Sequence, residues 1–421
     1  MRFRNVEEIA SWRLCVGCGA CVYVCPERKI VMVDREKEGL RPLIRSKICR
    51  GCDDCVRVCP GREAGNQFKG RRMGQIAAIR EGFGPVLEVW EGFAPDPEIR
   101  FQGSSGGAST ALALYCLEKE GMDAVIHSGF DEQIPWRNRP VVSLGREDLL
   151  SRTGSRYGPA SVCDGLASVE SIPSSCVFIG KPCDVEGLRK IQALKPGLNA
   201  EVGLAIGIFC AGTPSTRGTL DLLKEMKIDS DAVEEIRYRG KGWPGNFSIR
   251  LKGERNEIRE MSYRRSWSFL QKYRPFRCYL CPDITAEFAD ISCGDPWYRE
   301  IKEGDLGHSL VLVRTEKGQK AIRGAMEAGY LTLESVPPDI VGKSQASLLA
   351  KRREIWGRLL ALRIAGIPAP RYDGFPLYEN WRKLPTKDKA RSIIGTFRRI
   401  LQRKYYKPLD YRREEGMGTL F

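Results

Sequence analysis

Histidine is almost missing from this chain, which has two histidines among 421 residues. Acid–base and hydrolytic mechanisms that depend on an imidazole therefore have little support. We interpret His127, at the end of an apolar run, and His308, in a Gly-His-Ser turn, as structural residues. Electron transfer needs neither of them.

Long hydrophobic runs are also missing. The longest apolar stretches, such as residues 202–211, fall well short of the roughly 20 residues that a membrane-spanning helix needs. Residues 1–13 contain no apolar core of signal-peptide length. These absences predict a cytoplasmic protein whose thiols stay reduced and are available to bind metal.

The remaining composition is that of a folded protein. Hydrophobic residues make up 42% of the chain and charged residues 29%, which argues against a fibrous or fully disordered chain. A chain of 421 residues exceeds what one hydrophobic core usually organises. We therefore expect two or three domains.

Positive charge is concentrated at one end of the chain. The net charge is +15, and residues 382–413 hold twelve Lys and Arg against Asp388 and Asp410, so this stretch carries +10 of it. The rest of the chain is only mildly basic. Most of the net charge therefore lies in a C-terminal appendage, and we do not predict a nucleic-acid partner.

Sixteen cysteines are the strongest feature, and eight of them form an internal repeat. A Cys-x2-Cys-x2-Cys-x3-Cys-Pro run occurs twice, at Cys15, Cys18, Cys21 and Cys25 and at Cys49, Cys52, Cys55 and Cys59. This spacing is typical of bacterial two-cluster ferredoxins, in which the fourth cysteine of each run binds the other 4Fe-4S cluster. Two zinc sites are the alternative, but zinc needs four thiolates and would leave the third cysteine of each run without a simple role. We assign the ligands as Cys15, Cys18, Cys21 and Cys59 for one cluster, and Cys49, Cys52, Cys55 and Cys25 for the other.

The segment between the two runs predicts a short hairpin. The apolar residues 30–33 and 40–44 flank a turn-like stretch at 34–39. A compact ferredoxin domain is therefore expected over residues 1–67.

Four of the other cysteines suggest a third metal site. Cys278 and Cys281 form a Cys-x2-Cys-Pro pair, whereas Cys183 and Cys210 each follow a predicted strand, where loops of an α/β fold converge. Spacing leaves an iron–sulfur cluster, a zinc site and free buried thiols all open. The last four cysteines have no partner at metal spacing, and we interpret them as core residues: Cys116, Cys163, Cys176 and Cys293.

Loops, helices and strands alternate after the first domain, which predicts an α/β body over about residues 86–341. Strands are expected at 124–126, 177–179, 204–209 and 309–313, and helices at 111–120, 185–194 and 218–226. A basic, glycine-containing stretch at 68–80 reads as a linker. The overall class is α+β or α/β, with domains at 1–67, 68–160 and 161–343 and a helical basic tail at 344–421.

A run of small residues is the candidate phosphate-binding loop. Residues 103–110 read Gly-Ser-Ser-Gly-Gly-Ala-Ser-Thr and open a predicted helix, whose free N–H groups would donate to a phosphate. A flexible turn is the alternative, because the run is neither a Walker loop nor a dinucleotide fingerprint. A second candidate, Gly154-Ser155-Arg156-Tyr157, offers a guanidinium for phosphate and an aromatic ring for stacking.

The tail predicts a basic amphipathic helix. Ile393, Ile394, Phe397, Ile400 and Leu401 fall on one helical face, with Arg and Lys around them. Such a helix would dock on an anionic membrane surface or an acidic partner, or it would pack on its own body.

The order of these motifs resembles the beta-subunit family of coenzyme F420 hydrogenases and dehydrogenases, fused to an N-terminal two-cluster ferredoxin. The resemblance spans about residues 15–315. It is carried by the segments 106–112, 154–157, 179–184, 188–189, 209–214, 238–244, 278–281, 285–291 and 294–295. Nothing in the family pattern accounts for residues beyond about 344.

The resemblance implies bound FAD and a third 4Fe-4S cluster. The cluster would use Cys183, Cys210, Cys278 and Cys281, which fall on cysteine positions of the family. The flavin ring would lie near Cys210 and the Gly242-Trp243-Pro244 turn. The FAD-binding residues implied are Ser105, Gly106, Gly107, Ala108, Ser109, Thr110, Gly154, Ser155, Arg156, Tyr157 and Trp243.

The resemblance also implies an FAD- and iron–sulfur-dependent oxidoreductase that exchanges electrons between coenzyme F420, a hydride carrier, and its ferredoxin-type clusters or a partner protein. We expect the anionic tail of coenzyme F420 to meet Lys241, Arg264, Arg265 and Lys272. Two alternatives stay open. One is a ferredoxin-dependent reductase of an organic substrate, similar to chlorophyll-modifying reductases, and the other is a non-catalytic electron-relay subunit.

Overall fold

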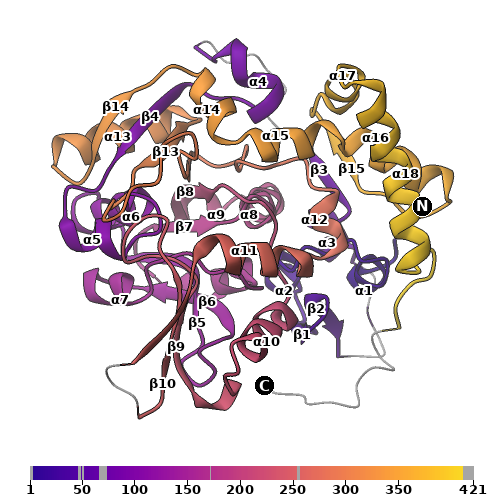
Figure 1. Ribbon diagram of the computed structural model, residues 1–421, viewed down its shortest axis with the longest axis horizontal. Helices are drawn as coiled ribbons and strands as arrows, with labels where there is room; N and C mark the ends of the chain where they lie inside the picture. The colour runs from indigo at the N-terminus through magenta and orange to yellow at the C-terminus, as the bar shows by residue number, and fades with distance from the viewer. Residues whose placement is uncertain are drawn as a thin grey trace.

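A mixed sheet forms the centre of the computed structural model, which describes residues 3–45, 49, 52–65, 74–170, 172–253 and 257–410. The strand order is β14-β4-β13-β12-β8-β7-β5-β6 (Figure 1). The strands from β12 to β5 run parallel, and both flanks are antiparallel. Their bounds are β4 (Glu88–Phe93), β5 (Ala124–Phe130), β6 (Asn138–Ser143), β7 (Cys176–Gly180), β8 (Val202–Ile208), β12 (Ile291–Gly294), β13 (Ser309–Val313) and β14 (Thr332–Ser335).

The central strands form because their sequences are almost continuously apolar. Nearly every residue of β7, β8 and β13 is buried, as expected where helices cover both faces of a sheet. The strands predicted at 124–126, 177–179, 204–209 and 309–313 are found in β5, β7, β8 and β13. The predicted mixed α/β class is confirmed.

Helices flank this sheet, and three of them were predicted. The predicted helices at 111–120, 185–194 and 218–226 correspond to α6, α8 and α10. Helix α6 begins after Gly107, whose φ of 77° suits glycine, and α8 begins with Pro182, whose fixed φ suits a first turn. The bounds are α4 (Ala77–Phe83), α5 (Pro97–Gln102), α6 (Ala108–Glu118), α7 (Arg146–Ser151), the 3-10 helix η1 (Val162–Val169), α8 (Pro182–Leu194), α9 (Leu198–Glu201), α10 (Thr216–Glu225) and α13 (Glu316–Glu327).

A smaller antiparallel sheet, β11-β10-β9, lies at the lower edge of the molecule (Figure 1). It packs through its own apolar cluster, which includes Tyr238, Phe247 and Leu270. The chain then returns to the centre through two helices. The bounds are η2 (Ser230–Ala232), β9 (Val233–Arg237), β10 (Phe247–Leu251), β11 (Ile258–Met261), α11 (Tyr263–Leu270), η3 (Gln271–Tyr273) and α12 (Phe276–Tyr279).

The N-terminal module contains the predicted hairpin. Strand β1 pairs with β2 in antiparallel register, with Ile30 opposite Ile44 and Arg35 opposite Gly39. The bounds are α1 (Val6–Ser11), α2 (Ala20–Val24), β1 (Ile30–Arg35), β2 (Gly39–Ile44), α3 (Asp54–Arg57) and β3 (Glu63–Gly65). Residues 68–73 of the predicted linker at 68–80 lie outside the described residues, and α4 begins at Ala77 within it.

The C-terminal segment folds back onto the N-terminal module. Strand β15 pairs in parallel with β3, and the Leu409 N–H donates to the Ser11 carbonyl oxygen (2.9 Å). Helix α18, drawn in yellow, therefore lies beside the N-terminus in Figure 1. The bounds are α14 (Asp339–Ser344), α15 (Ala346–Arg353), α16 (Ile355–Ile364), β15 (Arg371–Asp373), α17 (Leu377–Arg382) and α18 (Thr386–Gln402).

The predicted apolar face of the tail helix is split in the structure. Helix α18 buries Ser392, Thr396 and Ile400, whereas Ile394 and Leu401 are 66% and 67% exposed. The structure supports the alternative that the tail packs on its own body, and docking to a membrane or an acidic partner is not supported. Among the described residues, no helix combines the length and the hydropathy needed to cross a bilayer.

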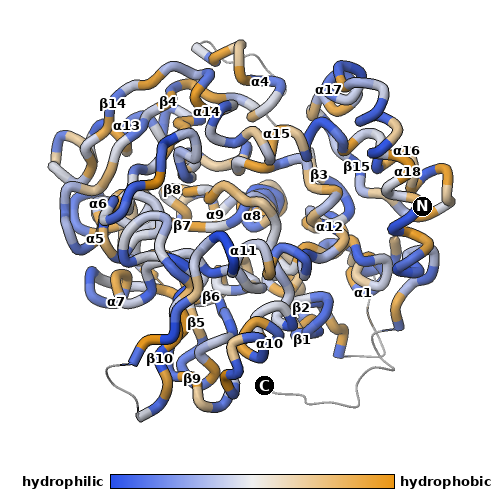
Figure 2. Tube along the Cα trace, viewed as in Figure 1, coloured by the Kyte–Doolittle hydropathy of each residue, from blue (hydrophilic) through white to orange (hydrophobic). Residues whose placement is uncertain are grey.

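One hydrophobic core joins three parts of the chain. It contains Leu14 of the N-terminal module, Phe178 and Phe288 of the central body, and Leu359 and Ile400 of the C-terminal segment. The hydrophobic colouring of β7, β8 and α8 marks the interior in Figure 2. The main sheet contains strands from both sides of residue 160, which is the predicted boundary between the second and third domains. The domain boundaries stay predictions.

Candidate functional site

Four cysteines of the N-terminal module surround one small cavity. Its lining includes Cys15, Cys18, Cys21 and Cys59, the set that the sequence assigns to the first cluster. Burial, together with the neighbouring charges of Cys15 and Cys18, raises the pKa of Cys59 to about 12. Thiols gathered in this way are stable as thiolates only with a bound cation, which is what a cluster supplies.

The ligands assigned to the second cluster are partly placed. Burial raises the pKa of Cys55 to about 12, and the charges of Cys52 and Cys49 add to this effect, so these three thiols are neighbours. Cys49 and Cys52 are exposed, and the half-buried Cys25 packs against the main core. This end of the module therefore faces solvent.

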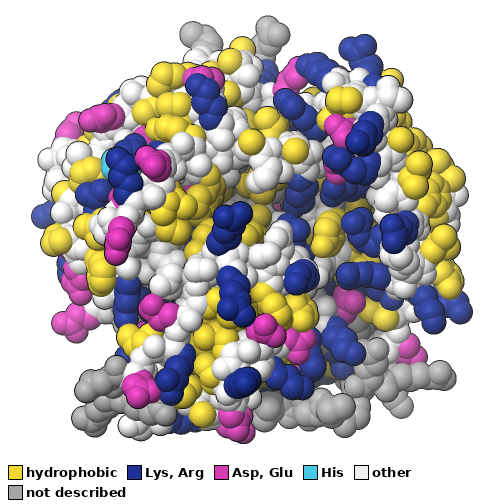
Figure 3. Space-filling model, in the orientation of Figure 1, with side chains coloured by type: hydrophobic (Ala, Val, Ile, Leu, Met, Phe, Trp, Pro, Cys, Tyr) yellow, Lys and Arg dark blue, Asp and Glu magenta, His cyan; other side chains and the backbone are white. Residues whose placement is uncertain are grey.

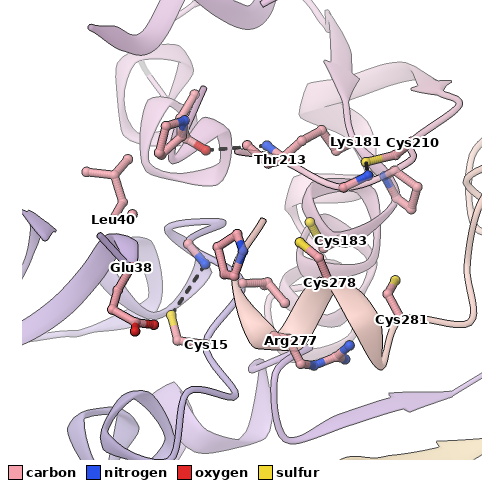
Figure 4. A pocket seen from close by; sticks show the side chains of 18 of the residues that line it. Cys15, Glu38, Leu40, Lys181, Cys183, Cys210, Thr213, Arg277, Cys278 and Cys281 are labelled. Atoms are coloured by element: carbon pink, nitrogen blue, oxygen red, sulfur yellow. Dashed lines mark hydrogen bonds between the residues drawn. The ribbon is translucent and has the colours of Figure 1, made fainter. Parts of the chain in front are cut away.

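The four candidate ligands of a third cluster line a single cavity of about 650 Å³. Cys183 is in the first turn of α8, Cys210 follows β8, and Cys278 and Cys281 lie at and after α12. Figure 4 shows the side chains of Cys183 and Cys278 directed toward each other. The sequence prediction that these residues meet is thus fulfilled in the geometry.

Cations and backbone donors surround this cavity. Lys181, Arg277 and Lys351 line it. Burial raises the pKa of Cys281 to about 11, while the charges of Arg277 and Lys351 lower it and so favour a thiolate. The Gly212 N–H also donates to Cys210 Sγ (3.3 Å; Figure 4).

A much larger cleft, of about 1960 Å³ including its open mouth, lies beside this cavity. It is lined by most of the residues that the resemblance implies for FAD, namely Ser105, Gly107, Ser109, Thr110, Gly154, Ser155, Arg156 and Tyr157. Gly107 stands at the N-cap of α6 and has no side chain to cap the helix, which begins at Ala108. The backbone donors of that first turn are the kind of group that binds a phosphate.

Three of the implied FAD residues are not in the cleft lining. A Cβ atom at Gly106 would lie 2.7 Å from the backbone of Ser309, so Gly106 serves close packing against β13. Ala108 is buried, and its N–H donates to Ser309 Oγ (3.3 Å). Trp243 is also buried and lies behind lining residues, donating from Nε1 to Asp295 Oδ1 (2.9 Å).

Arg239 organises the cleft, and the sequence analysis did not single it out. Its guanidinium is 97% buried and forms a bidentate ion pair with Asp295 (2.9 and 2.7 Å). It also donates to the carbonyl oxygens of Ser104 (2.6 Å) and Pro244 (2.9 Å). Burial lowers the pKa of Arg239, but the charge of Asp295 reverses this effect and keeps the guanidinium charged. The available signal was that Arg239 and Asp295 fall within two of the resembling segments.

Aromatic rings form one wall of the cleft. The rings of Tyr263 and Trp297 stack at an interplanar angle of 7°, with centroids 5.3 Å apart, and Trp243 stacks behind Trp297. Tyr157 packs against Trp267. These surfaces suit a planar heterocycle.

The basic residues expected to meet an anionic substrate lie elsewhere. Lys241, Arg264, Arg265 and Lys272 are not among the cleft lining, whose cations are Arg152, Arg156, Lys181 and Arg239. Arg265 is exposed and lies 3.6 Å from a Glu225 oxygen. Arg156 donates to Asn138 Oδ1 and to the carbonyl oxygens of Ile236 and Pro135, which uses three of its five donors within the protein.

The residues interpreted as structural are mostly buried. Cys116, Cys163 and Cys176 are fully buried, and Cys163 lies beside the cluster ligand Cys18. Cys293 is 94% buried and also lines the cleft. His127 Nε2 lies 2.8 Å from Ser143 Oγ inside the protein, and burial lowers its pKa to about 4.

The cleft and the two cavities are contiguous. Lys181, Cys210, Gly212 and Thr213 line both the cleft and the third-cluster cavity. Cys15 lines both the third-cluster cavity and the first-cluster cavity. A line of sites therefore leads from the cleft to the N-terminal module.

Three family models match the chain. Residues 14–62 match a 4Fe-4S dicluster domain. Residues 89–167 match the N-terminal part, and residues 174–339 the C-terminal part, of the coenzyme F420 hydrogenase/dehydrogenase beta subunit. These last two matches together cover more than half of the chain.

Curated relatives show the same similarity. The coenzyme F420 hydrogenase subunit beta of Methanococcus voltae is 27% identical over 299 residues, which are 68% of this chain and 99% of that protein. The coenzyme F420-dependent sulfite reductase of Methanocaldococcus jannaschii is 28% identical over 338 residues, which are 77% of this chain and 47% of that protein. The match to the second relative thus spans about half of its length.

A solved structure shares the fold. A chain of the F420-reducing NiFe hydrogenase complex from Methanosarcina barkeri aligns with a TM-score of 0.54 and 23% identity. The alignment covers 70% of this chain and 98% of that one.

Proposed function

Because this chain belongs to the coenzyme F420 hydrogenase/dehydrogenase beta-subunit family and carries a 4Fe-4S dicluster domain, we propose that it is an iron–sulfur flavoprotein oxidoreductase. Its hydride-carrying substrate is coenzyme F420, and its electrons pass between that substrate and the N-terminal clusters. The relatives named above act with this coenzyme according to their names.

The contiguity of the cleft and the two cysteine cavities is the observation that carries this proposal. Cys210 borders the cleft and the third-cluster cavity, and Cys15 borders that cavity and the first-cluster cavity. Electron transfer needs closely spaced centres, and these shared walls supply them. A hydrolase or a binding module would have no use for such a row of thiols.

The cleft residues fit FAD. The loop at Ser105–Thr110 and the first turn of α6 would bind its phosphates, and the Tyr263 and Trp297 wall would contact a planar ring. Arg239 would hold the loop in place through the Ser104 carbonyl oxygen. FAD, when bound, supplies the exchange between two-electron hydride chemistry and one-electron transfer.

The third cluster is tested by iron content. Cys281→Ser is expected to lower the iron content of reconstituted protein by about one third, because one of three 4Fe-4S clusters is lost. Cys116→Ala is the matched control, since Cys116 is a buried thiol that lines neither the cleft nor the two cysteine cavities. Equal iron in Cys281→Ser and the unaltered protein would remove the third cluster from the proposal.

The proposed reaction is tested under anaerobic conditions after reconstitution with iron, sulfide and FAD. Reduced coenzyme F420, NADPH and reduced ferredoxin are added separately while flavin and cluster absorbance are followed. We expect rapid bleaching by reduced coenzyme F420. Bleaching by ferredoxin alone would instead favour the ferredoxin-dependent reductase.

A protein partner is part of the proposal. The relative from Methanococcus voltae is named as a subunit, and the structural neighbour belongs to a complex. Cys49 and Cys52 are exposed in this chain, so the second cluster would lie where a redox partner can approach. These observations also support the relay alternative, which turnover of coenzyme F420 by the isolated chain would contradict.

A further inference from the structure

The C-terminal segment, residues 346–410, holds the loop that carries two of the proposed third-cluster ligands. Three backbone carbonyls of this loop accept hydrogen bonds from the segment. They are Tyr279 O from Arg358 Nη1 (2.6 Å), Leu280 O from Tyr372 Oη (2.6 Å) and Pro282 O from Arg352 Nη1 (3.1 Å). These carbonyls lie between and directly after Cys278 and Cys281, so the segment fixes the backbone that positions both thiols.

A buried ion pair fixes the position of α15 in this segment. The Arg352 side chain is fully buried and pairs with Glu287, whose side chain is 1% exposed. Displacing α15 would leave Glu287 as an unpaired buried charge, which proteins strongly disfavour. The residue before Arg352 is therefore also held in place.

That residue is Lys351, which lines the third-cluster cavity together with all four cysteines. Lys181 in the same cavity is neutralised by Asp184, with Nζ and Oδ2 2.6 Å apart. Lys351 forms no ion pair with any carboxylate of the described residues. Its charge therefore acts on the cavity together with that of Arg277, and the carboxyl groups of Glu38 and Asp283 in the lining oppose both.

We propose that Lys351 sets the reduction potential of the third cluster. Reduction adds one electron, and hence one negative charge, to a cluster that its thiolate ligands already make anionic. A fixed ammonium group stabilises the reduced state more than the oxidised state and so raises the reduction potential. Lys351 is a positioning residue here, because it acts on the cluster through its charge and binds no iron.

This assignment gives the C-terminal segment a role that the family match leaves unexplained. The C-terminal family model ends at residue 339, whereas Lys351 and the three loop donors all lie beyond it. The inference rests on the proposed function, because it requires that the third cluster is present.

The test is an anaerobic redox titration of the full chain, with the clusters followed by electron paramagnetic resonance. In Lys351→Met and Lys351→Gln, the midpoint potential of the third cluster is expected to fall, while those of the two N-terminal clusters stay unchanged. Lys351→Arg keeps the charge and is expected to retain the potential of the unaltered protein. Arg353→Met removes an exposed charge from the same helix and is expected to change none of the three.

Each contrary result has a separate meaning. An unchanged midpoint potential in the neutral variants, with full iron content, would overturn the inference. An equal fall in Lys351→Arg would also overturn it, because the charge would not be the cause. Loss of the third cluster from both neutral variants would overturn it in favour of a role in assembly. Absence of that cluster from the unaltered protein would instead contradict the proposed function.

Discussion

Arg277 Nη2 donates a hydrogen bond to the Pro60 carbonyl oxygen over 2.9 Å, in the buried interior. Arg277 adjoins Cys278 in the chain, and Pro60 adjoins Cys59. A single hydrogen bond therefore connects the backbone beside a proposed third-cluster ligand to the backbone beside a first-cluster ligand. This contact fixes the two cysteine-bearing loops relative to each other.

Replacing Arg277 is expected to destabilise the junction. In Arg277→Met the Pro60 carbonyl would be left buried without its donor, which costs about 1–3 kcal/mol. Anaerobic thermal denaturation measures this loss as a lower Tm. Arg371→Met is the control, because the Arg371 side chain is 77% exposed on the neighbouring strand β15. Equal Tm values for both variants would contradict the role of the hydrogen bond.

Arg239→Met is expected to weaken FAD binding at least about tenfold, equivalent to about 1.4 kcal/mol. The variant loses the donor to Ser104 and leaves Asp295, whose side chain is 14% exposed, without its ion-pair partner. Fluorescence titration of the flavin measures the change in Kd. Arg250→Met, on β10 and paired with surface glutamates, serves as the control and should bind FAD normally. Unaltered flavin affinity in Arg239→Met would contradict the proposal that the loop at Ser105–Thr110, which Arg239 holds in place, binds FAD.

The buried His127 predicts a loss of stability in acid. Burial lowers its folded-state pKa to about 4, while the charges of Arg152 and Asp148 act in opposite directions. The unfolded chain, with an ordinary pKa near 6.5, binds more protons than the folded chain between these two values. Stability therefore falls as the pH drops through this window, by about 1 kcal/mol between pH 7 and 5.5.

Chemical denaturation at the two pH values, compared between the unaltered protein and His127→Gln, measures that contribution. Glutamine keeps a polar group beside Ser143 but does not titrate, so the difference attributable to His127 should disappear. An identical pH dependence in both proteins would show that His127 is protonated as easily in the folded state as in the unfolded state.

Two neighbouring residues of α18 are expected to behave oppositely. Ile400 is 2% exposed in the shared core, and Ile400→Ala should cost about 2–5 kcal/mol of stability. Leu401 is 67% exposed, and Leu401→Ala should change stability by less than about 0.5 kcal/mol. Thermal denaturation of both variants distinguishes packing on the body from an exposed docking helix, for which the two losses would be similar.

Local patterns in the sequence were sufficient for much of the fold. The two cysteine runs predicted the ferredoxin module, whose domain match covers residues 14–62. Apolar runs predicted β5, β7, β8 and β13, because a strand buried on both faces needs such a run. The four cysteines of the proposed third cluster were predicted from a Cys-x2-Cys pair, two strand ends and the family resemblance.

The tail shows where local reasoning fails. Helical periodicity put Ile394 and Leu401 on one apolar face with Ile400, but the body packs against Ser392, Thr396 and Ile400 and leaves Ile394 and Leu401 exposed. The partner surface, formed by α16 and α17, decides which face of α18 is covered. Lys and Arg side chains gather over this region in Figure 3, so its charge is spread over a folded surface.

The sequence by itself determined the 4Fe-4S dicluster domain, because cysteine spacing fixes which thiols can reach one cluster within a loop. Tertiary structure alone decided the relations between distant segments. Arg239 meets Asp295, Arg277 meets Pro60, and Lys351 lines the same cavity as Cys183, which lies 168 positions earlier in the chain. The physical reason is that a charge acts through space, and no local pattern records which distant groups the fold brings to it.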